Sequence, residues 1–275
     1  MGKNSHIEWT HHTFNPWWGC AKVSPACQHC YAEAWAKRVG NKVWGAKAPR
    51  RFFGVEHWQE PLKWNAEAQR TGVRYRVFCA SMADVFEDRS DLNAARTRLW
   101  DLIDATPMLD WLLLTKRPEH VGKLTRWRTD WPENVWLGTT VENQEWADKR
   151  MPHLLANAAK TRFLSCEPLL GNIDLSAFIE KGKKSPVHWV ITGGESGPHS
   201  RPMDPQWVRN LRDYCRRSKI AFHFKQWGHW VPIELLTKEQ KNVIIVGNAE
   251  MAAAGKKVAG RLLDGRTWDE LPRSA

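Results

Sequence analysis

The chain repeats one pattern of hydrophobic and polar positions. A short apolar run is followed by a polar turn, and then by a stretch whose apolar residues recur every three or four positions, which is typical of parallel βα units. The runs that show this pattern are residues 75–80, 110–114, 134–138, 161–165, 188–192 and 221–225. Each run is predicted to be a buried strand.

Helices are predicted around these runs. Residues 91–105 begin with an aspartate and carry leucines at helical spacing, and residues 205–217 begin with a proline, which is favoured in a first helical turn. Residues 31–38 are rich in strong helix formers. Right-handed crossovers of this kind close into a barrel or an open parallel sheet. Because residues 14–19 would add one more strand, we predict an α/β fold class, a partial or full TIM-like parallel (β/α) barrel.

The remaining segments are interpreted as additions to a single domain. A chain of 275 residues is within the usual size of one barrel. Residues 40–60, with their Pro, Gly and basic residues, are interpreted as an insertion. The periodicity weakens after Trp230, so residues 231–275 are interpreted as a C-terminal extension. We therefore expect residues 1–275 to form one domain with an N-terminal cysteine loop and a C-terminal appendage.

Composition and charge narrow the class of protein. The chain is 42% hydrophobic and 26% charged, which is ordinary for a globular protein and excludes a disordered or fibrous one. Its 41 Lys and Arg against 30 Asp and Glu give a formal charge of +11, which attracts polyanions and acidic proteins. No apolar run has the 18 to 20 or so residues that cross a bilayer, and residues 1–15 lack a signal-peptide pattern. We therefore expect a cytoplasmic protein with no membrane partner.

Three cysteines lie within eleven residues, Cys20, Cys27 and Cys30, on a loop marked by Gly19 and Pro25. In a reducing compartment such thiols are metal ligands more often than disulfides. A structural zinc site would need a fourth ligand, whereas three thiolates suit a [4Fe–4S] cluster with one open iron. The predicted helix after Cys30 would point its positive end at a negatively charged cluster. Both metals remain open at this point, and the cluster is favoured.

Polar side chains follow the apolar runs directly. The carboxyl ends of parallel strands in a barrel meet at one edge, so these side chains are expected to form a pocket. Carboxylates there would accept hydrogen bonds from an ammonium or from ribose hydroxyls, and basic groups would pair with a carboxylate or phosphate. Each residue alone is as well explained as a helix cap or a rim ion pair. The candidate cofactor-binding residues, including the tyrosine after the last cysteine, are Tyr31, Ser81, Asp84, Thr115, Lys116, Glu142, Glu167 and Glu195.

Basic and aromatic residues are also interleaved. Three segments show this mixture or a dense basic run, at residues 50–53, 126–128 and 216–219. Such segments suit the binding of a nucleic-acid backbone with stacked bases. For any single segment, a solvated surface is the simpler interpretation.

The residues around the cysteines resemble a known family. The segment Ile7-Glu-Trp-Thr10, followed by Phe14-Asn-Pro16, Gly19-Cys20 and Cys30-Tyr-Ala-Glu33, is similar to the three-cysteine-motif family of phage and bacterial proteins, which is related to radical S-adenosylmethionine (SAM) enzymes. The similarity continues through most of the chain, at residues 81–84, 114–118, 138–142, 165–168 and 193–196.

This resemblance implies a radical-SAM-like barrel with the cysteine loop after its first strand. Cys20, Cys27 and Cys30 would bind a [4Fe–4S] cluster, and SAM would bind the open iron through its amino and carboxylate groups. One electron would then cleave the sulfonium and release a 5′-deoxyadenosyl radical, which abstracts hydrogen from an unidentified substrate. The first gap between cysteines is six residues here, against three in the commoner radical SAM pattern. The catalytic residues are not identified by the resemblance.

Partners and alternatives follow from the same expectation. An electron donor such as flavodoxin or ferredoxin would be needed, a nucleotide or nucleic-acid substrate suits the positive charge, and a family-specific partner protein is also expected. The first alternative is a zinc-binding nucleic-acid-binding protein without catalysis. The second is a degenerate barrel whose cluster serves structure or sensing.

Overall fold

The computed structural model describes residues 2–179, 183–197, 199–238 and 242–272. The chain divides into two compact units. The first unit consists of Met1–Ser24, Ala32–Thr139 and His153–Arg162. The second consists of Pro25–Tyr31, Thr140–Pro152 and Phe163–Ala275. The expected insertion at 40–60 and extension at 231–275 stay predictions.

Parallel strands form the sheet of the first unit. In hydrogen-bonding order they are β1 (His12–Thr13), β4 (Tyr75–Cys79), β5 (Leu109–Thr115) and β6 (Val135–Thr140, whose last residue belongs to the second unit). Leu112 and Leu113, neighbours on opposite faces of β5, are both 0% exposed. Burial on both faces is what a near-continuous apolar run predicts for a parallel strand.

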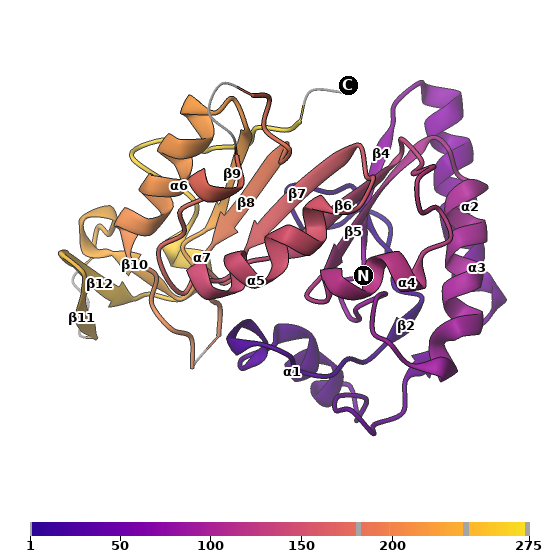
Figure 1. Ribbon diagram of the computed structural model, residues 1–275. Helices are drawn as coiled ribbons and strands as arrows, with labels where there is room; N and C mark the ends of the chain where they lie inside the picture. Colours follow the sequence, from indigo (N-terminus) through magenta and orange to yellow (C-terminus); the bar gives the residue numbers. More distant parts are fainter. Residues whose placement is uncertain (1, 180–182, 198, 239–241, 273–275) are drawn as a thin grey trace. The chain divides into compact units, whose positions relative to one another are not determined.

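Helices pack beside these strands. Figure 1 shows α2 (Val55–Thr71) and α3 (Asn93–Asp104) side by side, and α2 also contacts β4 and β5. Trp58, Trp64 and Ala68 on α2 are buried, and the helix ends at Gly72 in the left-handed conformation. Shorter elements complete the unit: α1 (Tyr31–Arg38, which begins in the second unit), η2 (Ser90–Leu92), η3 (Pro118–His120) and α4 (Val121–Leu124).

The strand expected at residues 14–19 is divided in two. Phe14 continues the pairing of β1 by donating its N–H to the Phe78 carbonyl at 3.0 Å. Pro16 follows, and because proline has no N–H it interrupts the ladder. The chain resumes as β2 (Trp17–Trp18), which pairs antiparallel with β3 (Arg51–Phe52).

The second unit contains the parallel strands β7 (Thr161–Cys166, whose first two residues belong to the first unit), β8 (Trp189–Gly193) and β9 (Ala221–Gln226). Every residue of β8 is buried. Helix α6 (Pro205–Arg217) packs on β8 and β9, as Figure 1 shows, and the Asp204 side chain caps it by accepting from the Gln206 N–H at 2.8 Å. The remaining elements before β10 are η1 (Pro25–Cys27), α5 (Gln144–Leu155) and η4 (Ser176–Phe178).

The C-terminal part of the second unit has an antiparallel sheet of its own. Its strands pair in the order β10 (Trp230–Pro232), β12 (Ala249–Ala253) and β11 (Val243–Val246), with η5 (Ile233–Leu235) and α7 (Lys256–Ala259) beside them in sequence. The chain then returns to β9, where the Phe224 N–H donates to the Trp268 carbonyl at 2.9 Å.

The predicted fold class is confirmed. Within each unit the parallel strands follow the order of the chain, β1-β4-β5-β6 in the first and β7-β8-β9 in the second. Helices α3, α5 and α6 lie between successive strands in the sequence, so this is the α/β topology of a partial TIM-like barrel. Among the residues that the structure describes, no helix is both long and apolar enough to cross a membrane.

Candidate functional site

The carboxyl ends of β4 and β5 meet at Asp84. Its Oδ1 accepts from the Thr115 hydroxyl at 2.8 Å, and its Oδ2 accepts from the Lys116 N–H at 3.0 Å and from Arg117 at 2.9 Å. Burial raises the pKa of this carboxyl, but the guanidinium and the hydrogen bonds outweigh burial and hold the pKa below its usual range. Asp84 is therefore an ionised group whose oxygens already have protein partners.

Arg117 connects this carboxylate to the cysteine loop. Its Nη1 lies 3.6 Å from Cys20 Sγ, and its Nη2 donates to the Ala21 carbonyl at 2.8 Å. Burial and the nearby Asp84 raise the pKa of Cys20 to about 12, and Arg117 opposes that rise. A metal-ligating cysteine must lose its proton, and a guanidinium beside the sulfur favours the thiolate.

The backbone that precedes Cys20 is held by residues of the first unit. The Asn15 side chain donates to Ser81 Oγ at 3.1 Å and accepts from the Met82 N–H at 2.7 Å. The Gly19 N–H donates to the Met82 carbonyl at 3.0 Å. Gly19 has a φ of +118°, and a Cβ there would lie 2.4 Å from the Val43 carbonyl oxygen. Only glycine fits this position, so the turn before Cys20 depends on it.

Arg50 supports the same turn from behind. It is buried, and it forms a bidentate ion pair with Glu87 at 3.1 and 2.7 Å while donating to the Val43 carbonyl at 3.1 Å. The exposed Arg51 instead lies over the Trp18 ring, 4.7 Å from its centroid, and over Phe53. Within the interleaved segment 50–53, Arg50 is therefore structural and Arg51 belongs to a surface patch.

In the second unit, the segment that carries Cys27 and Cys30 is anchored at Ala26. The Ala26 N–H donates to Glu142 Oε1 at 3.2 Å, and Glu142 Oε2 accepts from Arg150 at 2.8 Å. Both charged side chains are at most 2% exposed. Arg150 also donates to the Thr140 carbonyl at 2.9 Å. Glu142 was predicted to bind a cofactor, and its carboxylate here holds the cysteine segment; direct cofactor contact stays a prediction.

Glu195 anchors the same segment from β8. Its Oε2 lies 3.1 Å from His29 Nδ1, and Arg201 contacts both carboxylate oxygens, at 3.0 and 2.6 Å. Burial raises the pKa of Glu195, but its bonds to Arg201 and His29 outweigh burial and lower it. Arg201 also donates to the Pro25 carbonyl at 2.9 Å. Sequence reasoning did not select Arg201, although it lies only six residues after the predicted Glu195.

A third carboxylate lies at the end of β7. Glu167 Oε1 pairs with Lys225 Nζ of β9 at 3.0 Å, and both side chains remain partly exposed. A Cβ at Gly193 would lie 3.1 Å from the same oxygen, so the end of β8 passes close to Glu167. Tyr31, also in this unit, is 55% exposed. The Glu167–Lys225 pair offers one negative and one positive group at the ends of the two strands that flank β8.

The six cysteines differ in exposure. All of them lie in the described part of the chain and are thiols. Cys79, Cys166 and Cys215 are 0% exposed, as expected for small buried hydrophobes, whereas Cys20, Cys27 and Cys30 are partly exposed. The three thiols of the motif are thus the ones that a metal could reach.

A family model matches almost the whole chain. The model is described as a protein of unknown function, DUF5131, and it matches residues 4–272. The chain belongs to the DUF5131 family. No curated protein matches this DUF5131 chain.

Two solved structures resemble this DUF5131 protein. A mutant of spore photoproduct lyase is 14% identical, with a TM-score of 0.52 over 79% of this chain and 75% of that one. A second mutant of the same lyase, with bound AdoMet and dinucleoside spore photoproduct, is 12% identical with a TM-score of 0.49, covering 92% of this chain and 71% of that one. At these identities the first structure shows a shared fold.

The predicted site residues of the DUF5131 protein gather within each unit. The first unit joins Asp84, Thr115 and Lys116 to Arg117 and Cys20. The second joins Glu142 and Glu195 to the segment with Cys27 and Cys30. Among the described residues, no group of three or more His, Cys, Asp and Glu side chains is arranged to hold a metal ion. A single centre shared by the three cysteines stays a prediction, and the accessible thiols with a neighbouring guanidinium fit a cluster by their chemistry.

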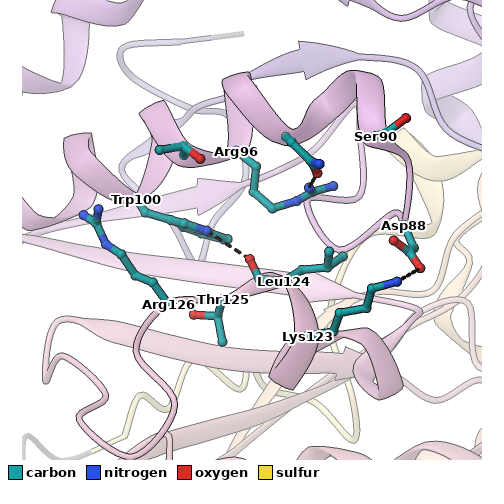
Figure 2. A pocket seen from close by; sticks show the side chains of 10 residues that line it. Asp88, Ser90, Arg96, Trp100, Lys123, Leu124, Thr125 and Arg126 are labelled. Carbon is teal, nitrogen blue, oxygen red and sulfur yellow. Dashed lines mark hydrogen bonds and ion pairs between the residues drawn. The ribbon is translucent and has the colours of Figure 1, made fainter.

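A polar hollow of about 610 Å³ lies elsewhere in the first unit, between α3 and α4. Figure 2 shows Lys123 directed at Asp88 and the Trp100 indole directed at the Leu124 carbonyl, at 2.6 and 3.1 Å. Its other basic groups also have protein partners: Arg126 pairs with Asp101 and Asp104. None of the predicted metal-binding or cofactor-binding residues lines this hollow, whereas Arg126 of the basic and aromatic segment 126–128 does.

Proposed function

We propose that this DUF5131 protein is an iron–sulfur enzyme of the radical SAM type. Cys20, Cys27 and Cys30 would hold a [4Fe–4S] cluster and leave one iron for SAM. The observation that carries the proposal is the contrast in exposure between these three thiols and the three buried ones. The fold shared with a spore photoproduct lyase supports it.

The cluster and SAM would supply one-electron cleavage of a sulfonium bond and hydrogen abstraction from a substrate. The residues of the chain prepare the site for that chemistry. Arg117 places a positive charge beside Cys20 and stabilises its thiolate. Asp84 holds Arg117 in that position. Arg117 therefore offsets part of the rise in the pKa of Cys20, so the thiolate that binds iron forms at a lower cost in free energy.

The Glu167–Lys225 pair is the proposed subsite for the amino-acid end of SAM. An ammonium and a carboxylate on one ligand need an acceptor and a donor in reach, and this pair offers both beside the small Gly193. Ser81 and Lys116, at the other strand ends, are proposed to contact the rest of the cofactor. The buried Asp84, Glu142 and Glu195 act by positioning.

The charge of +11 supports partners that are negatively charged. We propose a nucleotide or nucleic acid as the substrate, since the exposed Arg51 lies over two aromatic rings on one surface. An acidic electron donor such as flavodoxin or ferredoxin is proposed for the same electrostatic reason. A family-specific partner protein and a cytoplasmic location stay predictions.

Anaerobic reconstitution tests the proposal. The purified chain is expected to bind about four irons and four sulfides, and its absorbance is expected to change when SAM is added. Cys20→Ala, Cys27→Ala and Cys30→Ala should each lose most of the iron. Cys215→Ala is the matched control, since that buried thiol should leave the iron content unchanged. With dithionite as reductant, the wild type should release 5′-deoxyadenosine from SAM.

Two results would count against this function. One zinc per chain with no cluster would favour the non-catalytic nucleic-acid-binding alternative. A reconstituted cluster that never cleaves SAM, with reductant and nucleic acid supplied, would favour a structural or sensing role.

A further inference from the structure

The segment 25–30 of the second unit is held by two buried carboxylates, each with an arginine of its own. Glu142 pairs with Arg150, and Glu195 pairs with Arg201. The carboxylates come from different places: Glu142 follows β6, and Glu195 follows β8. Both reach a segment of six residues that includes Cys27 and Cys30.

The Glu142 contact fixes the backbone. Its Oε1 accepts from the Ala26 N–H at 3.2 Å, one residue before Cys27. Arg150 is itself fixed, because it donates to the Thr140 carbonyl at 2.9 Å and its guanidinium lies 4.1 Å from the centroid of the Trp146 ring. A carboxylate that is 0% exposed and paired in this way has little freedom to move.

The Glu195–Arg201 pair fixes the segment at three further residues. Arg201 donates to the Pro25 carbonyl at 2.9 Å and to Gln28 Oε1 at 3.3 Å, and Glu195 contacts His29 at 3.1 Å. The backbone N–H of Arg201 also donates to Glu195 Oε2 at 2.8 Å, so Arg201 binds this carboxylate through both its backbone and its side chain. Because Arg201 spans from the carboxylate to the segment, its removal would release several contacts together.

The segment has little regular structure to hold it otherwise. Its internal backbone bond in the described structure joins the Gln28 N–H to the Pro25 carbonyl at 3.1 Å, across the short η1. A loop of this kind gains a defined shape from side chains that bond its backbone groups. The external bonds from Glu142 and Arg201 supply that definition on both sides of Cys27.

We infer that Arg201, with Glu195, and Glu142, with Arg150, are positioning residues that preset the segment 25–30 so that Cys27 and Cys30 are ready to bind a metal centre. This inference rests on the proposed function for the identity of the centre. Partners that orient metal ligands from outside the ligand shell commonly change metal affinity by about 10-fold to 100-fold when they are removed. Arg201 contacts both Pro25 and Gln28 of the segment, so it is the residue to test first.

The experiment compares Arg201→Gln, Arg201→Lys and Arg209→Gln with the wild type. Arg209→Gln is the matched control, because Arg209 is a half-buried arginine of the same unit whose ion pair, with Asp264 at 2.8 Å, lies away from the segment. Amide hydrogen exchange of the metal-free proteins measures the order of residues 25–30. Iron release to a chelator from the reconstituted proteins measures cluster retention. Circular dichroism checks that each variant is folded.

Arg201→Gln should raise exchange within residues 25–30 and release iron at least about tenfold faster than the wild type. Arg201→Lys keeps the positive charge but loses the several N–H donors of the guanidinium. Its exchange and its iron release should therefore lie between those of the wild type and Arg201→Gln. Arg209→Gln should match the wild type in both measurements. Glu142→Gln gives an independent check, since it should speed exchange at the Ala26 amide.

Unchanged exchange and unchanged iron release in a folded Arg201→Gln variant would overturn the inference. Exchange in the metal-free protein does not depend on which metal binds. It therefore tests the ordering of residues 25–30 separately from the proposed iron–sulfur function. If exchange rises in Arg201→Gln but the wild type never takes up iron, the proposed function fails. The role of Arg201 and Glu195 in iron binding is then overturned as well. Faster iron release without a change in exchange would also contradict presetting of the segment.

Discussion

The Nη1 atom of Arg117 lies 3.6 Å from the Sγ atom of Cys20. The same nitrogen donates to Asp84 Oδ2 at 2.9 Å, so the guanidinium stands between a carboxylate and a thiol. Burial makes charge separation costly here, and the ion pair with Asp84 offsets part of that cost. The arrangement keeps one permanent positive charge beside a cysteine proposed to bind iron.

Replacing Arg117 is expected to make the cluster harder to reduce. Reduction adds negative charge, which the guanidinium stabilises, so Arg117→Gln should lower the reduction potential. A loss of roughly 1 kcal/mol of attraction corresponds to about 40 mV for one electron. Redox titration of the reconstituted protein, followed by electron paramagnetic resonance, measures the change. Arg117→Lys keeps a positive charge, so its reduction potential should lie close to that of the wild type. Equal potentials in the wild type and Arg117→Gln would contradict this role.

Asp84→Asn is expected to destabilise the first unit, because it leaves the Arg117 guanidinium buried without a counter-charge. Breaking a buried pair in this way costs about 3–5 kcal/mol. The folded-state pKa of Asp84 lies below the ordinary value of 3.8. Its contribution is therefore complete above pH 4 or so and is lost as the pH falls through the lower folded-state value.

Urea unfolding at pH 7 and at pH 3 measures this difference between wild type and Asp84→Asn. The difference in the free energy of unfolding between the two proteins should have its full size at pH 7 and be smaller at pH 3. Asp88→Asn is a suitable control, since Asp88 forms an exposed pair with Lys123 and should change stability little at either pH. A gap that is the same at both pH values would show that Asp84 acts in some other way.

Six parallel strands, β4 to β9, and three of the helices, α1, α3 and α6, could be predicted because their signals are local. The run 110–114 is apolar on both faces, which identifies a buried parallel strand without knowledge of its neighbours. Helix α2 was missed, since the Pro and Gly residues of 40–60 suggested an insertion and Pro61 lies inside the helix. The buried positions 58, 61, 64 and 68, each three or four residues from the next, were the signal that could have identified it.

The candidate site was predictable as a set of residues but not as a set of contacts. The position of Glu142 after an apolar run indicated a strand-end carboxylate, and that is where it lies. Its partner Ala26 is 116 residues away in the sequence, and Arg201 is 176 residues from Pro25. Such pairings depend on how crossovers bring distant strand ends together, and no local pattern encodes them.

Gly19→Ala is expected to destabilise the protein and to reduce metal uptake. The new Cβ would lie 2.4 Å from the Val43 carbonyl oxygen and 2.7 Å from Arg50 Cδ, in a backbone conformation with φ of +118°. Strain and collision together should cost about 2 kcal/mol or more. Because Gly19 precedes Cys20, the cysteine should also shift.

Gly40→Ala is the matched control for this prediction. Gly40 also has a positive φ, of +78°, but a Cβ there meets nothing within 4 Å. It should report the conformational strain alone, which is about 1 kcal/mol. Thermal or urea unfolding and iron content after reconstitution would be measured for both variants. If the two alanines have equal effects, the collision at Gly19 is not what requires glycine there.

His12 is expected to make the protein less stable in mild acid. Burial is the main reason that its pKa falls from 6.5 to about 4, and the neighbouring His11 adds to the effect. The ring stacks on Trp64 with centroids 4.5 Å apart, and its Nδ1 accepts from the Asn4 N–H at 3.2 Å. Protonation at Nδ1 would remove that hydrogen bond and place a charge on a side chain that is 3% exposed, so the folded state resists it.

The sign of the pH effect follows from these two pKa values. The unfolded chain takes up a proton near pH 6.5 and the folded chain only near pH 4, so acid favours unfolding between them. The contribution of His12 to the free energy of unfolding should be constant above pH 7.5 or so, fall by on the order of 3 kcal/mol toward pH 4, and then level off. His12→Gln has no such group and should lose this part of the slope, even if it is less stable at pH 7. Urea unfolding of both proteins between pH 7.5 and pH 5 makes the comparison, in which the other titrating groups cancel. Parallel curves for the two proteins would show that His12 does not control stability in this range.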